Sequence, residues 1–346
     1  MRFVTIAGAR PQFVKVAVVA RALDDLGDVD HRIIHTGQHY DHRMSAQFFD
    51  ELAIPEPDHN LGIAGGSHGQ MTGRMMEAIE GILLQAPPDA VLIYGDTNST
   101  LAGGLAAAKL HLPVYHVEAG LRSFNRRMPE EVNRVLSDHI SEILFCPTTT
   151  AVDHLAKEGI TDGVHLVGDV MYDATIFARE AARQRSTIMG DLNLVDGSYI
   201  LLTLHRAENT DDPSRLAEIC RYVEEHAGTS KLVFPVHPRT RHAFQRQRLE
   251  INGCQMIEPV GYIDMHRLIA GASMVMTDSG GLQKEAYFHR KPCLTLRDET
   301  EWVETIEAGW NRLWTSPGYA PRREIDVYGD GDAGFKIAQI IQTAHC

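Results

Sequence analysis

Short apolar runs alternate along the chain with longer stretches in which apolar residues recur every three or four positions. The short runs predict β-strands buried on both faces, and the helical spacing between them predicts amphipathic α-helices. Strands that alternate with helices in this way form βαβ units, which build parallel sheets. The pattern therefore predicts an α/β protein.

Two series of strands are predicted, separated by a mostly helical bridge after residue 168. The first series lies at residues 2–8, 31–37, 90–96, 114–119, 142–147 and 164–168. The second series lies at residues 199–205, 231–237, 255–260, 274–278, 292–296 and 311–315. Because each series can form its own sheet, we expect two Rossmann-like, doubly wound domains that face each other across a cleft. The expected domains are 1–170 and 171–333, and a helix at 334–346 could complete the first domain.

Length, composition and charge narrow the class of protein. The chain has 346 residues, which suits two domains, and no apolar run approaches the roughly 18 residues of a membrane span. The formal net charge of -13 disfavours a nucleic-acid binder, which needs clustered Lys and Arg. The five cysteines have neither metal-type nor disulfide-type spacing. The first strand begins at the N-terminus, so we expect no signal peptide and a cytoplasmic protein.

Two apolar runs in the first half end on a carboxylate, at Asp96 and at Glu118. Ligands bind parallel sheets at the carboxyl ends of the strands, so two acids at one edge suggest proton chemistry. Asp96 could instead be the N-cap of the helix that follows it. Glu118 needs a partner if it is buried, and Arg122 is the expected one.

Further charged residues could join this edge of the first sheet. Glu130 and Glu131 begin a predicted helix and could add a third carboxylate, although acids in a first turn are also explained by the helix dipole. Arg10 and Lys15 follow the first strand and could meet a diphosphate. The alternative for these two residues is a pair of solvated cations.

In the second half the segment TDSGG at 277–281 joins a predicted strand to a predicted helix. A helix N-terminus with free backbone N–H groups is an anion site, and Gly280 and Gly281 would let a phosphate approach the backbone. Ser279 could cap the helix and donate to the phosphate, and Glu285 could accept ribose hydroxyls. The alternative is a tight turn that simply needs glycine.

Several histidines could carry protons or bind a metal. His205 ends an apolar strand and could donate a proton or bind phosphate, and His237 repeats this pattern, although a lone His is more often structural. His35, His39 and His42 do not have a recognised zinc spacing, so we expect no metal.

Seven motifs occur in one order over nearly the whole chain. They are GARPQFVK at 8–15, HTGQH at 35–39, YGDTNST at 94–100, HVEAGLR at 116–122, PEEVNR at 129–134, LHRAEN at 204–209 and TDSGG at 277–281. Together they resemble the non-hydrolysing UDP-N-acetylglucosamine 2-epimerase family. The resemblance implies a two-domain fold of the glycosyltransferase-B type and an epimerisation without nicotinamide or another cofactor. In that scheme a base removes the C2 proton while UDP leaves C1, and UDP then adds back.

The resemblance also implies roles for individual positions. The implied catalytic set is Asp96, Glu118, Glu130 and His205. The implied UDP-binding set is Arg10, Lys15, Arg134, His205, Ser279, Gly280, Gly281 and Glu285. The cations and the glycine turn would hold the diphosphate, Glu285 the ribose, and the loop at 259–265 the uracil. A UDP-sugar is the expected small-molecule partner, and a homodimer is the expected assembly.

Two departures from many bacterial members bear on the substrate. Ala9 and Gln12 stand where those members have Thr and Glu, and Trp302 begins the segment where they have Arg-Pro. Both departures resemble the subgroup that acts on UDP-2,3-diacetamido-2,3-dideoxyglucuronic acid, giving the manno epimer for surface polysaccharide. The Arg pair at 126–127 could bind the C6 carboxylate of that sugar. A similar loop occurs in members that use UDP-N-acetylglucosamine, so both substrates stay open.

Other functions also stay open. The residues at 40–41 differ from the pattern linked to a second, activating substrate site, so that site is not expected. A glycosyltransferase of the same fold would need an acceptor, and a hydrolysing 2-epimerase would release UDP and free sugar. A non-enzymatic sugar-nucleotide sensor would bind UDP without exchange at C2.

Overall fold

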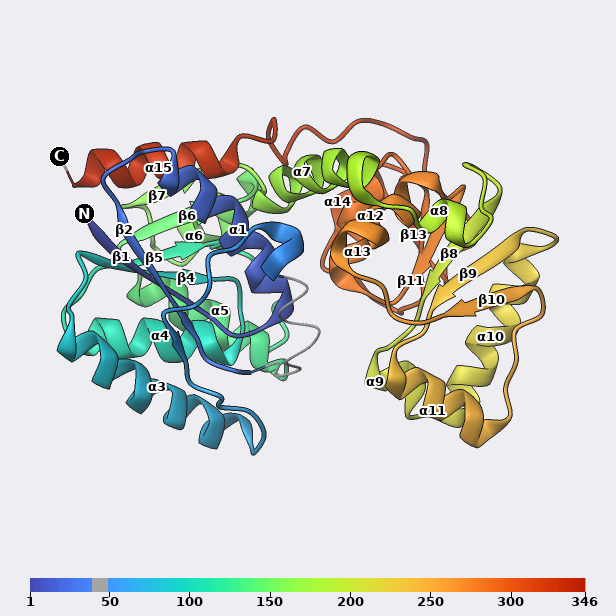
Figure 1. Ribbon diagram of the computed structural model, residues 1–346, viewed down its shortest axis with the longest axis horizontal. Helices are drawn as coiled ribbons and strands as arrows, with labels where there is room; N and C mark the ends of the chain where they lie inside the picture. The colour runs from blue at the N-terminus through green and yellow to red at the C-terminus, as the bar shows by residue number, and fades with distance from the viewer. Residues whose placement is uncertain (39–48, 346) are drawn as a thin grey trace. The chain divides into compact units, whose positions relative to one another are not determined.

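The computed structural model describes residues 1–38 and 49–345 and confirms an α/β chain with two parallel sheets (Figure 1). The chain divides into two compact units. The first unit contains Met1–Ala174 and Asp326–Cys346, and the second contains Thr175–Ile325. His39, His42 and the departure at 40–41 lie outside the described residues.

A seven-stranded sheet forms the centre of the first unit. It contains β1 (Arg2–Ala7), β2 (Asp30–His35), β3 (His59–Asn60), β4 (Ala90–Tyr94), β5 (Val114–Val117), β6 (Ile143–Cys146) and β7 (Val164–Leu166). The spatial order is β3-β2-β1-β4-β5-β6-β7, and all the pairings are parallel. The order reverses between β1 and β4, which is the switch point where doubly wound sheets bind ligands. Every residue of β4, with the sequence AVLIY, is buried, as a strand covered on both faces requires.

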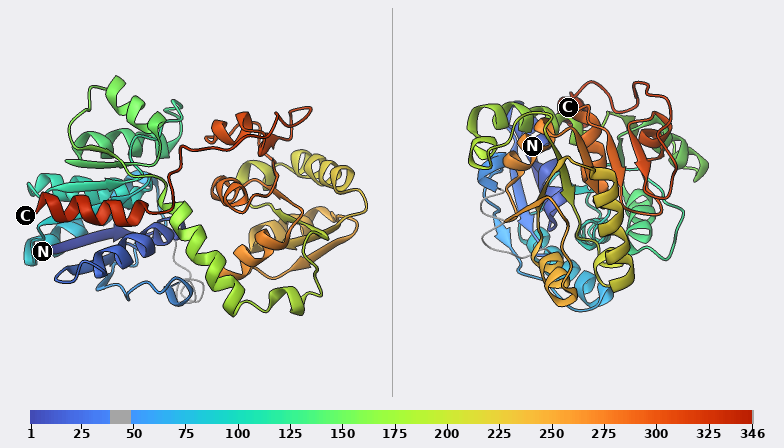
Figure 2. Two further views of the ribbon diagram at one scale, coloured as in Figure 1. Left: turned by 90° about the horizontal axis from the view of Figure 1, so that it is seen from above. Right: turned by 90° about the vertical axis from the view of Figure 1, so that its right-hand side faces the viewer.

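The helices of the first unit cover both faces of this sheet (Figure 1). They are α1 (Arg10–Asp24), α3 (His68–Gln85), α4 (Asn98–Lys109), α5 (Pro129–Ile140), α6 (Thr149–Lys157) and α15 (Ala333–Ala344), and α7 (Val170–Arg185) leads out of the unit. The C-terminal helix α15 packs along α1 (Figure 2). Asp173 accepts the Gly334 N–H at 2.9 Å, which fixes the start of α15.

A six-stranded parallel sheet forms the centre of the second unit. It contains β8 (Tyr199–Thr203), β9 (Lys231–Pro235), β10 (Cys254–Ile257), β11 (Met274–Thr277), β12 (Cys293–Thr295) and β13 (Asn311–Leu313). The order is β10-β9-β8-β11-β12-β13, so it reverses between β8 and β11. Thr203 and Thr277 are in register, and their hydroxyl oxygens are 2.6 Å apart. The carboxyl ends of these two central strands are therefore level.

The connections of the second unit are mostly helical. The helices are α8 (Ile188–Asp191), α9 (Ala207–Thr210), α10 (Pro213–Ala227), α11 (Pro238–Gln247), α12 (Tyr262–Gly271), α13 (Gly280–Phe288) and α14 (Val303–Glu307). The region at 259–265, expected as a loop, already enters α12 at Tyr262. No helix of the described residues combines the length and apolar character of a membrane span.

Every predicted strand overlaps an observed one, but several predicted ends extend into loops. The strand predicted at 199–205, for example, ends at Thr203 because the chain turns before His205. β3 was missed, since His59 and Asn60 are exposed polar residues without an apolar signal. Apolar runs therefore located the buried strands and could not locate an exposed edge strand.

Two glycines between α6 and β7 allow a prediction about stability. Gly159 has φ +82°, and a Cβ there would meet no atom within 4 Å. Gly163 has φ +68°, and a Cβ there would overlap the carbonyl oxygen of Glu142. Gly159→Ala should lower the free energy of unfolding by about 1 kcal/mol, the cost of an L-residue in the left-handed region. Gly163→Ala should cost at least about 1 kcal/mol more, because backbone must move.

Urea unfolding followed by circular dichroism measures both losses. Equal losses for the two variants would show that the contact with Glu142 does not constrain Gly163.

Candidate active site

Asp96 and Glu118 lie at the carboxyl edge of the first sheet, after the adjacent strands β4 and β5. Gly95 lies against both Glu118 and Lys15. A Cβ on Gly95 would be 3.2 Å from Glu118 Oε2 and 3.1 Å from Lys15 Nζ. The fold therefore brings together two of the predicted acids and one of the predicted cations.

Lys15 is a partner of Glu118. Its ammonium group donates to Glu118 Oε2, and both side chains are only 9% exposed. The prediction that Arg122 pairs with Glu118 is wrong. Arg122 instead donates to Asp138 at 2.6 Å and to Glu158 at 2.7 Å. Its guanidinium therefore lies between these two acids.

The backbone of Glu118 has an unusual conformation. Its φ is +70°, in the left-handed region that side chains other than glycine rarely adopt. The N–H groups of Glu118 and Ala119 both donate to the Phe145 carbonyl oxygen at 3.1 Å, which holds the turn. Such a conformation costs on the order of 1–3 kcal/mol and is found most often at functional sites.

Asp96 interacts with a different cation. Arg134 donates to Asp96 Oδ2 at 2.5 Å and to Glu131 Oε2 at 3.0 Å. The N-cap alternative for Asp96 is wrong, because Thr97 caps α4. Burial raises the pKa of Asp96 although Arg134 and Lys15 oppose this shift. The Asp96 carboxyl therefore holds a proton more readily than an exposed Asp does.

The two acids that begin α5 have different environments. Glu131 is buried and accepts hydrogen bonds from Ser123 N at 2.8 Å, Ser123 Oγ at 3.0 Å and Phe124 N at 2.8 Å. Glu130 is exposed, and no hydrogen bond or ion pair joins it to another described residue. Glu131 therefore orders the loop before α5, whereas the Glu130 carboxylate is accessible to a ligand.

A buried pair that sequence reasoning missed supports the two acids. His116 Nε2 donates to the Gly95 carbonyl oxygen at 2.8 Å, and Nδ1 donates to Asp138 at 2.7 Å. Asp138 also accepts the Gly120 N–H at 3.1 Å. Burial alone would raise the pKa of Asp138, but the hydrogen bonds and charges of His116 and Arg122 outweigh burial and lower it. Both His116 nitrogens therefore face oxygen atoms that can accept hydrogen bonds.

The hydrogen bonds of Gln12 explain why this chain has Gln where many bacterial members have Glu. Its Oε1 accepts the N–H groups of Gly8 at 2.8 Å and Ala9 at 3.0 Å. Its Nε2 donates to the Tyr94 carbonyl oxygen at 2.9 Å and to Thr100 Oγ1 at 3.0 Å. A carboxylate cannot donate, so a Glu at this position could not make the last two bonds.

Three arginines of the first unit are accessible from solvent. Arg10 begins α1, and Arg126 and Arg127 lie in the loop that Glu131 orders. Their exposure is compatible with binding a charged ligand.

In the second unit the glycine turn joins β11 to α13. Ser279 occupies the N-cap position, but its hydroxyl makes no capping hydrogen bond, contrary to the expectation from the sequence. The N–H groups of Gly280 and Gly281 have no acceptor among the described residues. A Cβ on Gly281 would meet no atom within 4 Å, so that side of the turn is open. Free N–H groups at an open helix N-terminus can bind an anion.

Trp302, in the segment where many bacterial members have Arg-Pro, holds the glycine turn at Gly280 in place. Its Nε1 donates to the Gly280 carbonyl oxygen at 3.0 Å, and the indole is only 8% exposed. Lys284 Nζ lies 4.0 Å from the centroid of the ring, in a cation–π contact. Trp302 is thus a packing residue of the turn, a role that no sequence motif indicated.

His205 follows β8, next to the strand that leads into the turn. Its Nδ1 is 3.2 Å from Asp278 Oδ1, and the side chain is 45% exposed. Asp278 is fully buried and also accepts the N–H groups of His205 and Arg206. Burial would raise the pKa of Asp278, but the hydrogen bond and charge of His205 outweigh it, so the pKa is lowered. With Nδ1 engaged, Nε2 is the nitrogen able to exchange a proton.

Asp278 was present in the quoted motif, but sequence reasoning gave it no role. Its side chain aligns His205 and Arg206 through three hydrogen bonds to their backbone N–H groups. Glu285, the predicted ribose ligand, lies further along α13 with its side chain 10% exposed.

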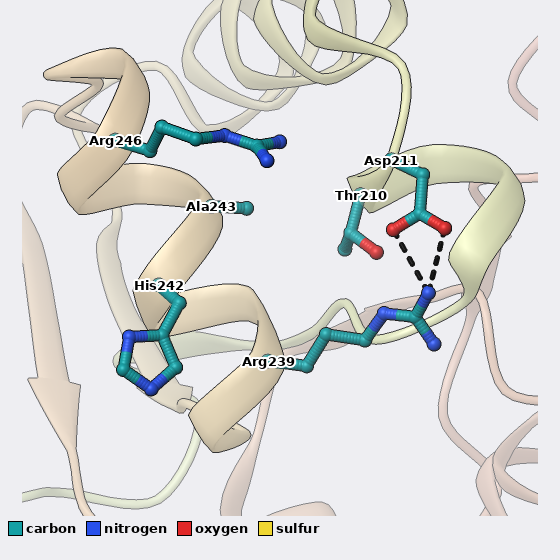
Figure 3. A pocket seen from close by; sticks show the side chains of 6 residues that line it. All are labelled: Thr210, Asp211, Arg239, His242, Ala243 and Arg246. Atoms are coloured by element: carbon teal, nitrogen blue, oxygen red, sulfur yellow. Dashed lines mark hydrogen bonds and ion pairs between the residues drawn. The ribbon is translucent and has the colours of Figure 1, made fainter.

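A separate hollow of about 240 Å³ lies on α9 and α11 (Figure 3). Arg239 donates to both carboxylate oxygens of Asp211 at its edge, at 2.8 and 2.6 Å. The lining residues are Thr210, Asp211, Arg239, His242, Ala243 and Arg246. None of them was predicted as a site residue.

Comparisons with known proteins agree with the seven motifs. The family model for UDP-N-acetylglucosamine 2-epimerase matches residues 21–342. The chain is 49% identical to UDP-2,3-diacetamido-2,3-dideoxy-D-glucuronate 2-epimerase of Pseudomonas aeruginosa, over 99% of both chains. It is also 49% identical to a UDP-N-acetylglucosamine 2-epimerase homolog of Methanococcus maripaludis, over 99% of this chain and 100% of the relative.

A solved structure is similar over the same extent. The UDP-GlcNAc 2-epimerase of Methanocaldococcus jannaschii, in complex with UDP-GlcNAc and UDP, matches with a TM-score of 0.89 and 41% identity. The match covers 99% of this chain and 100% of that structure. The glycosyltransferase-B type of fold, implied by the motifs, is confirmed. The chain belongs to the UDP-N-acetylglucosamine 2-epimerase family.

Proposed function

We propose that the chain is a non-hydrolysing UDP-sugar 2-epimerase that inverts C2 of a UDP-2-acetamido sugar. In the first step the C2–H and C1–O bonds break, a C1–C2 double bond forms, and UDP departs with the C1–O electron pair. In the second step UDP adds back to C1 while C2 accepts a proton on the opposite face. The grouping of Asp96, Glu118 and Lys15 at one sheet edge is the observation that carries this proposal.

The acids of the first unit suit different parts of the proton transfer. The adjacent ammonium of Lys15 favours the charged form of Glu118, as a base requires. Burial raises the pKa of Asp96, which favours a proton on that carboxyl, as an acid requires. Glu130, which is exposed at the start of α5, is the third proposed acid-base group. We assign proton abstraction to Glu118 and reprotonation to Asp96.

The second unit suits the nucleotide. The free N–H groups of Gly280 and Gly281, together with the Ser279 hydroxyl, would bind the diphosphate, and Glu285 would bind the ribose. His205 is aligned by Asp278 and could protonate the departing UDP. Contacts of Arg10, Lys15 and Arg134 with UDP stay predictions. Lys15 and Arg134 already serve as partners of Glu118 and Asp96.

We favour the diacetamido uronate as substrate. The support is the relative from Pseudomonas aeruginosa and the two exposed arginines at 126–127, which could pair with a C6 carboxylate. UDP-N-acetylglucosamine is the alternative substrate, since another relative at the same identity has that name. The role in surface polysaccharide synthesis, the cytoplasmic location and the homodimer stay predictions.

Exchange at C2 tests the proposed reaction. Each UDP-sugar is incubated with the protein in D2O and followed by proton NMR. Deuterium should enter C2 while a manno signal appears, without any added acceptor. Intact protium at C2 in both sugars would refute the epimerase. Release of UDP with free sugar would instead indicate hydrolysis.

Replacing either carboxyl group by an amide should stop the exchange, because an amide cannot serve as the base or the acid. Glu118→Gln and Asp96→Asn should each lower the rate at least about 100-fold, since positioned acids and bases contribute roughly that much. Their affinity for UDP, measured by calorimetry, should stay within about threefold of wild type, because UDP is assigned to other residues.

Glu77→Gln is the matched control, because Glu77 is exposed on α3. Its exchange rate should equal that of wild type. A Glu118→Gln variant that turns over at the wild-type rate would remove Glu118 from the catalytic set.

The arginine loop gives a test of the substrate. Replacing both Arg126 and Arg127 by Ala should raise KM for the diacetamido uronate about tenfold, because a charge-assisted contact with the C6 carboxylate is lost. The KM for UDP-N-acetylglucosamine, which has no C6 carboxylate, should change less than twofold by the same reasoning. Steady-state kinetics with both sugars measures this. An equal change for both sugars would show that the loop does not select the uronate.

A further inference from the structure

A buried histidine pair lies behind Glu285 in the second unit. His266, on α12, is 0% exposed, and its Nδ1 is 2.9 Å from Nε2 of His289. The other nitrogen of His266, Nε2, has no hydrogen-bond partner. It lies 3.7 Å from Glu285 Oε1. No step of the proposed reaction uses this pair.

Glu285 is itself an unusual carboxylate. Its side chain is 10% exposed, and no hydrogen bond to it occurs among the described residues. A carboxylate removed from water without donors is costly, so this position favours a ligand that brings donors. Glu285 is four residues after Gly281, so both lie on the same side of α13. Hydroxyl groups adjacent to a phosphate at the turn are the donors that fit this arrangement.

The position of the proton between the two histidines determines whether His266 Nε2 presents an N–H group or a lone pair to Glu285. If His266 Nδ1 carried the proton, its Nε2 lone pair would face the carboxylate and repel it. If His289 Nε2 donates to His266 Nδ1, the neutral His266 has its proton on Nε2, facing the carboxylate. The second arrangement is the one that pairs donors with acceptors.

The surroundings keep this arrangement in place. Burial is the largest cause that lowers the pKa of His289 to about 2, so its ring is neutral at neutral pH. The ring of Tyr262 packs edge-on against His266, with centroids 4.3 Å apart. The His266 ring is therefore held between His289 and Tyr262, with Nε2 on the side of Glu285.

We propose that His266 is a positioning residue for nucleotide specificity. Its Nε2–H orients the Glu285 carboxylate to accept the ribose hydroxyls of the nucleotide, and His289 sets the required tautomer. The inference rests on the proposed function, because Glu285 meets a ribose only if the turn at Gly280 and Gly281 binds UDP. The 3.7 Å between His266 Nε2 and Glu285 Oε1 is longer than a hydrogen bond. Contacts of this kind commonly shorten when the ligand binds.

The experiment compares UDP with 2′,3′-dideoxy-UDP by calorimetry on the full chain. Wild type should bind UDP at least about tenfold more tightly, because the dideoxy compound leaves the buried carboxylate unpaired. In His266→Leu the preference should fall below about threefold, through weaker binding of UDP and unchanged binding of the dideoxy compound. His289→Leu should lower the preference in the same direction. His242→Leu, at an exposed histidine of α11, is the matched control and should keep the wild-type preference.

Each other outcome has a distinct meaning. If His266→Leu weakens both ligands equally, or keeps the full preference, the positioning role is wrong. If His266→Leu does not fold, His289→Leu decides, and a wild-type preference in that variant overturns the proposal. If wild type binds both ligands equally, the ribose contact and the inference fail, while exchange at C2 still tests the epimerase. If wild type does not bind UDP, the proposed function fails as well.

Discussion

Parallel strands deliver their last residues to one edge of a sheet, and all of the proposed chemistry depends on this constraint. Where the strand order reverses, the connecting helices leave on opposite faces, so the edge between the two central strands is not covered by a crossover. In the first unit this edge carries Lys15 and Asp96, after β1 and β4. In the second unit it carries His205 and Asp278, after β8 and β11.

Buried charges beneath each edge determine how these side chains are held. Removing a charge from water is costly unless partners compensate, and Asp138 and Asp278 each accept several hydrogen bonds. Asp138 binds His116, Arg122 and the backbone near Glu118, and Asp278 binds the backbone of His205. These networks provide the fixed surroundings that allow Glu118 to keep a left-handed backbone. The side chains of Glu118 and His205 can then react while the networks of Asp138 and Asp278 hold their backbone in place.

The elements that could be predicted from the sequence are those whose signal is local. The strand predicted at 90–96 matches β4 because a strand buried on both faces must be apolar at every position. Pro129 and the acids after it identified the start of α5, although only the structure separated the buried Glu131 from the exposed Glu130. The partner of Glu118 was predicted wrongly because Arg122 is close in sequence, whereas Lys15 is 103 residues away.

The sequence by itself determined the order of strands and helices, the family, and the identity of the residues able to carry protons or bind an anion. These features depend on apolar periodicity and short motifs, which neighbouring residues specify. Tertiary structure alone decided which charges meet, such as Lys15 with Glu118 and His266 with Glu285. The physical reason is that an ion pair or hydrogen bond depends on distances of a few ångströms between residues far apart in the chain. Only the packed sheets and helices fix those distances.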